Sequence, residues 1–232
     1  MELSFDVLDW LAVSRSEEKG DCVLTPVGAP KLEAIPKRLP MMLSRRMSLG
    51  SRFAVECALE LLEKHEVDAI VNASRHAETP RGEKSLCSIA KGMPPSPTDF
   101  TMSVHNAAAG ILTIHKKLTV PVTSVAAEGN TFEAGLFEAA AFLSDGKETV
   151  LLLDYENMLP PILGARLPAV KETFAVAILL QKGEKLKATA TAIEETEPEM
   201  PDVLQFIEGL ASNARSFTVR SGRHLWSWRV KA

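Results

Sequence analysis

The sequence predicts an α/β fold, because amphipathic helices alternate along the chain with short buried strands. Phe53, Cys57 and Leu61 share one helical stripe and predict a helix over 48–64, and the apolar, β-branched run that follows predicts a strand over 67–71. The same order returns as a helix over 103–118, a strand over 122–127, a helix over 131–144 and a strand over 149–154. Repetition of this order is typical of layered folds with a partly parallel sheet.

The segments between these elements are less regular. Residues 1–13 alternate loosely and predict a first strand or a short edge segment, whereas four prolines make 20–40 an irregular surface segment. Residues 74–100 are polar and broken, and we expect a loop there with one short helix near 85–90. A further proline-containing loop is expected over 155–170.

The last third of the chain has a different pattern. Two apolar runs, 174–181 and 186–193, are separated by Lys-Gly-Glu-Lys and predict a hairpin. An acidic link and a short helix over 203–211 lead into a strand region over 216–230. Within that region, Phe217 and Val219 share one face, as do Trp226 and Trp228.

Composition excludes several classes of protein. The 232 residues carry a net charge of -4, which argues against a nucleic-acid binder, and no apolar run is long enough to span a bilayer. The N-terminus lacks the basic and apolar regions of a secretory signal. The three cysteines show no C-x-x-C spacing, so we expect reduced thiols, no metal or cofactor, and a cytoplasmic location.

Few residues are candidates for chemistry. Cys57 lies on a buried stripe and is expected to be a core thiol, Cys22 lies in a loop, and Cys87 lies in a short helix. His76 and Glu78 lack a third partner and are expected to be solvated loop residues. The strand-to-helix turn at 127–130, where many α/β enzymes hold a nucleophile, contains neither Cys nor Ser.

Three motifs carry a resemblance to a known family. The runs SVHNAAAG, VTSVAAEGNTFEAGLFEAAAFLSDG and LSRRMSLGSRFAVECALELL are similar to the N-terminal half of β-ketoacyl synthases, over roughly residues 38–155. The run around SPT-F---SVHNAAAG most resembles chain-length-factor-like proteins of aryl polyene pathways. The resemblance implies a thiolase-like α/β/α layered half-fold with a mixed sheet. It also implies a single domain over 1–232, with 172–232 as a divergent closing segment.

Two departures from the family pattern indicate loss of catalysis. Counting along the motifs places the family's nucleophilic cysteine at Gly129, which has no side chain. The family's two catalytic histidines lie in a second repeat with Gly-rich motifs. Here His224 is the only histidine in the last hundred residues, and it lies in an expected strand. The resemblance therefore implies a non-catalytic chain length factor that forms a heterodimer with an active β-ketoacyl synthase and shapes its acyl tunnel.

The resemblance also implies which residues meet the partner. In the family, the strand before the turn pairs across a two-fold axis, and residues before the SVHN helix approach the partner's acyl pocket. The implied interface and tunnel residues are Thr98, Asp99, Phe100, Met102, His105, Asn106, Val122, Ser124 and Val125. Alternatively, Phe100 and Met102 are ordinary core residues, and His105 and Asn106 satisfy backbone groups at a helix end.

Other partners and functions stay open at this point. Five basic residues and no acid lie between 215 and 232, and they either form a solvated strand face or meet an acyl carrier protein with its phosphopantetheine-linked chain. A small thiol-dependent acyltransferase that uses Cys87, or a stand-alone acyl-binding scaffold, are the alternative functions.

Overall fold

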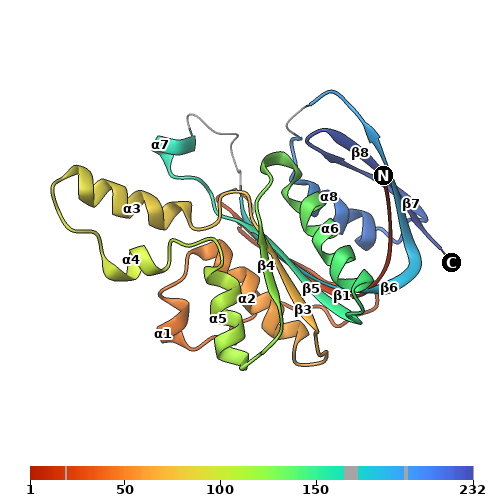
Figure 1. Ribbon diagram of the computed structural model, residues 1–232, viewed down its shortest axis with the longest axis horizontal. Coiled ribbons are helices and arrows are strands. Elements are labelled where there is room, and N and C mark those ends of the chain that lie inside the picture. Colours follow the sequence, from red (N-terminus) through yellow and green to blue (C-terminus); the bar gives the residue numbers. More distant parts are fainter. Residues whose placement is uncertain (19, 165–171, 196–197, 232) are drawn as a thin grey trace.

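A mixed sheet with helices on both faces forms the body of the protein (Figure 1). The computed structural model describes residues 1–18, 20–164, 172–195 and 198–231. Within these residues eight strands form one sheet, with the order β2-β1-β6-β5-β3-β4; β8 also pairs with β6, and β7 pairs with β8. This arrangement confirms the predicted α/β class and the mixed sheet.

The strands are β1 (Glu2–Ser16), β2 (Gly20–Leu24), β3 (Ala69–Ala73), β4 (Val122–Val125), β5 (Thr149–Glu156), β6 (Thr173–Ala192), β7 (Ser216–Ser221) and β8 (His224–Val230). The α-helices are α1 (Met41–Ser44), α2 (Leu49–Leu61), α3 (Thr79–Ala90), α4 (Pro97–Thr101), α5 (Ala107–Lys116), α6 (Thr131–Ser144), α7 (Pro161–Gly164) and α8 (Asp202–Ala211), and a 3₁₀ turn, η1, covers Glu128–Asn130.

The parallel part of the sheet follows the predicted alternation closely. Strands β3, β4 and β5 run parallel, with α2 and α5 packed on one face and α6 on the other. The bounds of α6 are the predicted ones, and Ser48 caps α2 by accepting a hydrogen bond from the Ser51 N–H. Gly135 lets α6 lie close to the sheet, because a Cβ there would approach Leu152 to 3.0 Å.

The predicted hairpin at 174–193 is wrong, because β6 is a single long strand. Its first half pairs with β5, its second half pairs with β8, and β1 runs antiparallel along both. The segment 182–185 interrupts the β1 register without reversing the chain. There the Asp6 carboxylate accepts a hydrogen bond from the Lys185 N–H at 2.9 Å, which stabilises a bulge-like irregularity in the strand pairing. The residue composition of this irregular segment is the reason that it was predicted to be a turn.

The C-terminal segment closes the face of the sheet that carries α6. Strands β7 and β8 form the hairpin, and α8 packs beside them. Phe206 lies 4.9 Å from Trp228 between ring centroids, and Trp226 stacks on Trp228 at 6.0 Å. As predicted, the two tryptophans share a buried face, so an aromatic cluster covers this end of the sheet.

Several boundaries differ from prediction. Strand β1 lies between β2 and β6 and is not an edge, and 20–24 is a strand within a segment expected to be irregular. Residues 74–100 contain two helices, α3 and α4, and α5 begins at Ala107 instead of 103. Part of the loop predicted over 155–170 falls on 165–170, outside the described residues, and α7 occupies 161–164.

Candidate functional site

The turn between β4 and α6 is sharp and internally hydrogen-bonded. The Thr131 hydroxyl donates to the Glu128 carbonyl at 2.7 Å and accepts the Ala127 N–H at 3.0 Å. Glu128 has a left-handed backbone with φ of 50°, which is unusual for a residue other than glycine. Gly129 follows it without a positive φ, so the backbone at this position does not itself require glycine.

The tip of the β7–β8 hairpin covers Gly129. The Gly129 carbonyl accepts the Gly222 N–H at 3.1 Å, and the Ser221 hydroxyl lies 3.2 Å from the same oxygen. A Cβ built on Gly129 would lie 3.6 Å from the Gly222 Cα, which is an ordinary van der Waals contact. The Asn130 side chain accepts the Arg223 N–H at 3.3 Å. Two segments far apart in sequence therefore form one unit around the turn.

Buried carboxyl groups lie on one side of this unit. The Ser221 hydroxyl lies 2.7 Å from Asp202 at the start of α8, and burial raises the pKa of Asp202 to about 6. Burial, together with the charges of Asp202 and Glu156, raises the pKa of Asp154 well above its usual value. Such groups favour the protonated form, because an ionised carboxylate is poorly solvated there.

The Glu133 carboxylate joins the hairpin to α6. Glu133 accepts the Trp226 indole N–H at 3.1 Å and lies 3.0 Å from the His224 Nδ1. The prediction that His224 lies in a strand is confirmed, because it is the first residue of β8. Its ring faces the Glu133 carboxylate of α6. Neither Glu128 nor Gly129 offers a thiol or hydroxyl, and the hydroxyls of Ser221 and Thr131 are engaged in hydrogen bonds. Hydrogen bonds within the turn and to the β7–β8 hairpin hold the turn in place, and the turn itself provides no nucleophile.

Strand β4 lies at the edge of the sheet. The carbonyls of Pro121 and Val125 accept hydrogen bonds from β3. Because alternate residues of a strand face one neighbour, the backbone groups of Val122 and Ser124 point away from β3. Val122 is 39% exposed. The edge therefore presents free hydrogen-bonding positions to a further strand.

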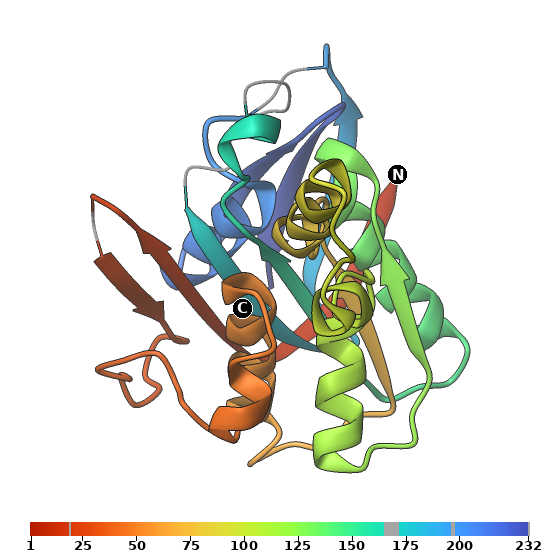
Figure 2. The same cartoon turned by 90° about the vertical axis from the view of Figure 1, so that its left-hand side faces the viewer.

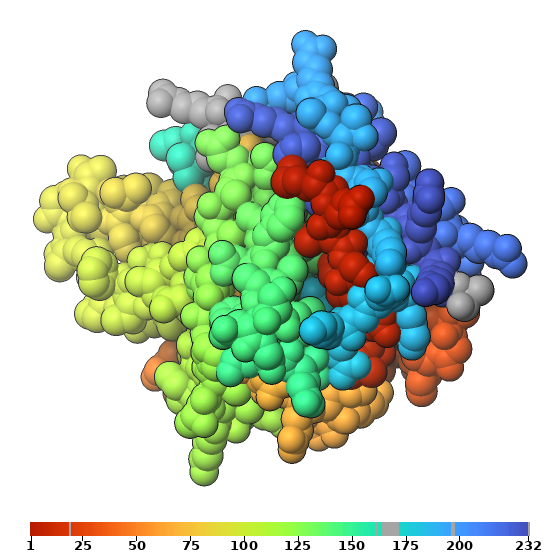
Figure 3. Space-filling model, turned by 45° about the vertical axis from the view of Figure 1, so that its right-hand side comes forward, coloured from red at the N-terminus to blue at the C-terminus, as the bar shows by residue number. Residues whose placement is uncertain are grey.

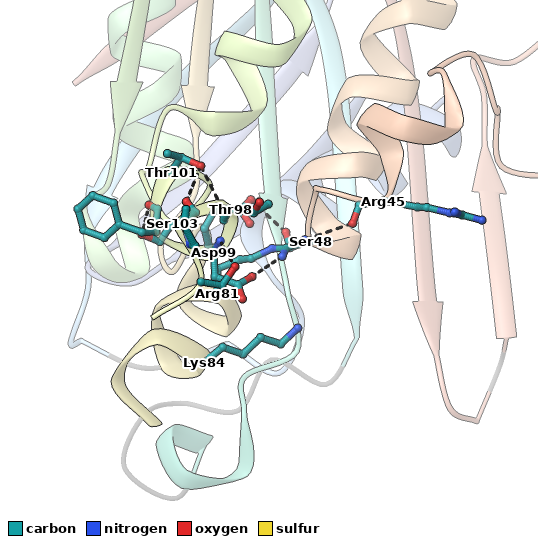
Figure 4. Close-up of polar contacts among 12 residues, drawn as sticks. Arg45, Ser48, Arg81, Lys84, Thr98, Asp99, Thr101 and Ser103 are labelled. Carbon is teal, nitrogen blue, oxygen red and sulfur yellow. Dashed lines mark hydrogen bonds and ion pairs between the residues drawn. The ribbon is translucent and has the colours of Figure 1, made fainter. Parts of the chain in front are cut away.

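Helices α3 and α4 project from the body as a helical arm, residues 79–101, which extends to the left in Figure 1 and faces the viewer in Figure 2. Figure 4 shows Arg81 between Asp99 of α4 and the backbone carbonyl of Arg45. The Arg81 guanidinium forms an ion pair with the Asp99 carboxylate and lies 3.5 Å from the Arg45 carbonyl oxygen. Among the candidate tunnel residues, Phe100 is 67% exposed, whereas Met102 is buried in the core beside α2. The core alternative is thus correct for Met102 and wrong for Phe100. Thr98 and Asp99 lie on α4.

The base of the arm is buried and polar, contrary to the expectation that Glu78 is solvated. Glu78 is only 1% exposed, accepts the Ser48 hydroxyl at 3.0 Å and has its pKa raised by burial. The Asn157 amide donates to Ser48 at 3.0 Å and to the Ala77 carbonyl at 2.9 Å. Sequence reasoning missed this network, because its members lie up to 109 residues apart.

The two residues before α5 differ in role. The His105 ring lies 2.7 Å from the Ser74 carbonyl, and its own carbonyl accepts the Asn72 side-chain amide at 3.1 Å. His105 therefore connects the start of α5 to the end of β3. Asn106 occupies the N-cap position, but its side chain makes no capping hydrogen bond, so the capping alternative is wrong for it.

A model of the β-ketoacyl synthase N-terminal domain matches residues 15–229. The chain belongs to the β-ketoacyl synthase family. No curated protein matches it. A chain in the solved structure of the ketosynthase ApeO in complex with its chain length factor ApeC, from Xenorhabdus doucetiae, is 37% identical, with a TM-score of 0.88, and the match covers 98% of this chain and 99% of that one.

Two structures that are less similar to this chain share its thiolase-like fold. A chain of the ishigamide ketosynthase/chain length factor is 13% identical, with a TM-score of 0.63 over 90% of this chain and 73% of that one. A chain of the AntDE:AntF complex, a type II polyketide acyl carrier protein with its ketosynthase, is 11% identical, with a TM-score of 0.68 over all of both chains. The predicted fold class is confirmed.

The thiols of this β-ketoacyl synthase family member lie away from the turn. Cys57 is fully buried, and burial raises the pKa of its thiol, as expected of a core residue. Cys22 on β2 and Cys87 on α3 are exposed. In the described part of the chain, no histidine hydrogen-bonds to Cys87, and no group of three or more His, Cys, Asp or Glu side chains could hold a metal ion.

The basic residues of the C-terminal segment lie on exposed positions of the closing hairpin and its ends. They are Arg215, Arg220, Arg223, Arg229 and Lys231. Among the described residues, Arg223 pairs with Glu195 at 3.0 Å and Lys231 lies 3.6 Å from Glu184. Among the helices described, none is long and apolar enough to cross a membrane.

Proposed function

We propose that the chain is a non-catalytic chain length factor that pairs with an active β-ketoacyl synthase and limits the length of the acyl chain. It forms one ketosynthase-like half-domain over 1–232, with 172–232 as its closing segment. The observation that carries the proposal is the turn before α6. The nucleophile position assigned to Gly129 has no side chain, and Glu128 at the left-handed position has no thiol.

Decarboxylative condensation requires a thiolate that holds the growing chain and donors that stabilise the developing charge. A buried thiol such as Cys57 cannot reach an external thioester, and its raised pKa disfavours the thiolate. The tip of the β7–β8 hairpin occupies the space beside Gly129. The chain therefore contributes walls and contacts, and a partner supplies the reactive thiol.

The edge strand β4 supports pairing with that partner. Val122, Ser124 and Val125 belong to this four-residue strand, and the backbone groups of Val122 and Ser124, which point away from β3, can extend the sheet into a second subunit. The 37% identical relative comes from a complex of a ketosynthase with its chain length factor, which makes such a subunit pair the natural model. Thr98, Asp99 and Phe100 lie on α4 of the arm, and His105 and Asn106 directly precede α5.

Length control would be steric. Phe100 is a large side chain exposed on α4, so it can enter a partner's acyl tunnel, whereas buried Met102 can only support the arm from behind. The exposed basic residues at 215–231 fit the acidic surface expected of an acyl carrier protein that delivers the phosphopantetheine-linked chain. No resident cofactor is needed for this role.

The proposal is tested by co-expression with the β-ketoacyl synthase of the same genome and by purification through a tag on that synthase. The wild-type chain is expected to co-purify in a one-to-one complex. Ser124→Pro removes an outward N–H without removing a bond to β3, so it should abolish co-purification and leave the chain folded. A wild-type chain that stays monomeric and never binds the synthase would overturn the proposal.

A further inference from the structure

The helical arm carries apolar side chains that the described parts of the chain leave exposed. Leu86 and Ile89 lie three residues apart on α3 and are 67% and 58% exposed, and Met93 just after the helix is 59% exposed. No residue of α3 is buried. Contiguous exposed apolar side chains of this kind mark interaction surfaces.

This exposure does not come from a loosely attached segment. Besides the Glu78 contacts at the base, Glu156 at the end of β5 accepts hydrogen bonds from the Ser74 hydroxyl at 3.1 Å and from the His76 N–H at 3.2 Å. The Arg81–Asp99 ion pair joins α3 to α4. The arm is therefore held in one orientation before any partner binds, which lowers the entropic cost of docking.

The position of the arm indicates what covers it. In Figure 1 the arm, α5 and β4 lie next to one another from left to right, and in Figure 3 the yellow arm projects at the left beyond the green surface of α5 and β4. Strand β4 has only four residues, whereas a stable interface buries roughly 1,200–2,000 Å² in total, from about 20–30 residues on each side. Pairing through β4 alone is thus too small, and the neighbouring arm supplies further exposed apolar side chains.

We propose that the apolar face of α3, formed by Leu86, Ile89 and Met93, is a docking surface for the β-ketoacyl synthase subunit that pairs with β4. This inference rests on the proposed function and extends it to a surface outside the acyl tunnel. Phe100 enters the tunnel, while the α3 face packs against the outside of the same subunit and fixes the relative orientation of the two chains.

The test compares two triple variants of the full chain for binding to the synthase of the same genome. Leu86→Ser, Ile89→Ser and Met93→Ser together should raise the dissociation constant by on the order of tenfold or more, because a few buried apolar side chains supply most of the binding energy of an interface. The matched control replaces three exposed apolar residues that lie off the arm, Leu24→Ser, Val27→Ser and Val230→Ser, and should leave binding unchanged. Circular dichroism and thermal melting check that both variants are folded.

Cysteine footprinting gives an independent readout. Cys87 lies on α3 about 100° around the helix from Leu86, so it is replaced by serine, and Ile89→Cys puts a thiol on the proposed face; exposed Cys22 on β2 lies at the opposite end of the sheet order. In the complex, alkylation of the thiol at position 89 should slow relative to the free chain, while alkylation of Cys22 should not. Equal rates at position 89 in the free chain and in the complex would contradict the proposal.

The outcomes separate this inference from the proposed function. If the wild-type chain binds the synthase, Ser124→Pro abolishes binding and the arm variant binds as tightly as the wild type, the docking surface is wrong and the function stands. If the wild-type chain does not bind the synthase, both are wrong. If the arm variant instead loses self-association, or loses only its binding to acyl carrier protein, the synthase is the wrong occupant.

Discussion

The carbonyl oxygen of Gly129 and the backbone N–H of Gly222 form a 3.1 Å hydrogen bond that joins the turn before α6 to the tip of the last hairpin. The residue at which the family pattern places a nucleophile is therefore part of an internal packing contact between the two ends of the fold. A small side chain added at Gly129 would fit beside Gly222. Such a substitution does not by itself supply the groups that would activate a nucleophile there.

Replacement of Gly129 tests that distinction. Because an added Cβ meets only an ordinary contact at 3.6 Å, Gly129→Ala and Gly129→Cys should both fold, with free energies of unfolding within about 1 kcal/mol of the wild type. Neither variant should catalyse condensation of acyl and malonyl carrier-protein substrates, because the histidine of the adjacent hairpin, His224, is engaged with Glu133. Gly129→Ala is the matched control, and condensation by purified Gly129→Cys alone would show that the machinery is present.

Gly50 should be far less tolerant of substitution. A Cβ at Gly50 would lie 2.7 Å from the Glu156 backbone carbonyl, and the Gly50 N–H donates to the Asn157 side chain at 2.8 Å. Gly50→Ala is expected to destabilise the fold by about 1–3 kcal/mol because backbone must move. Gly82→Ala on α3 meets nothing within 4 Å and should be neutral or stabilising by up to about 1 kcal/mol. Equal urea midpoints for the two variants would contradict the packing at Gly50.

Stability should depend on the protonation of Asp202. Burial raises the pKa of Asp202 from 3.8 to about 6, so the folded state binds more protons than the unfolded state between these values. The stabilisation from this group is complete below pH 3.8 and decreases as the pH rises to about 6. Asparagine resembles the protonated acid.

Asp202→Asn should therefore gain stability relative to the wild type as the pH rises through that window, as measured by melting temperature at several pH values. Thr218→Ser, at an exposed position, changes no titratable group, serves as the control and should show no such trend. A constant difference between Asp202→Asn and the wild type across the window would show that Asp202 does not titrate as described.

The three thiols should react unequally with iodoacetamide at neutral pH. Cys22 and Cys87 are exposed and should be labelled in the folded protein, whereas buried Cys57 should react only after denaturation, as read by mass spectrometry. We expect the chain to have no acyltransferase activity of its own, so alkylation of Cys87 should cause no loss of such activity. Loss of an acyltransferase activity on selective labelling of Cys87, with retention in Cys22→Ser, would favour the alternative of a thiol-dependent enzyme.

The elements that could be predicted from sequence are those with a buried face of regular period. Helix α6 has an apolar stripe along Phe132, Leu136 and Leu143, and its bounds were predicted correctly. Helix α3 has no buried face, so its periodicity could not indicate its length, and only its second half was predicted. The segment at 182–185 has the composition of a turn, but pairing with β1 holds both flanks in one strand.

The site could be predicted only where it depends on residue identity. The absence of a thiol at Gly129 is a property of the sequence. The burial of Glu78 by Ser48 and the cover of Gly129 by Gly222 depend on long-range contacts, for which local pattern carries no signal. Likewise, Phe100 and Met102 are similar apolar residues in sequence, and only the packing of α4 separates the exposed one from the buried one.

The most direct test of the central claim is a condensation assay with acyl and malonyl carrier-protein substrates. It compares the purified chain, the synthase with its nucleophilic cysteine replaced by alanine, and the wild-type complex. The account predicts no product from the chain alone or from its complex with the cysteine-deficient synthase, and products of defined length from the wild-type complex. Product from the isolated chain, free of synthase by mass spectrometry, would contradict it.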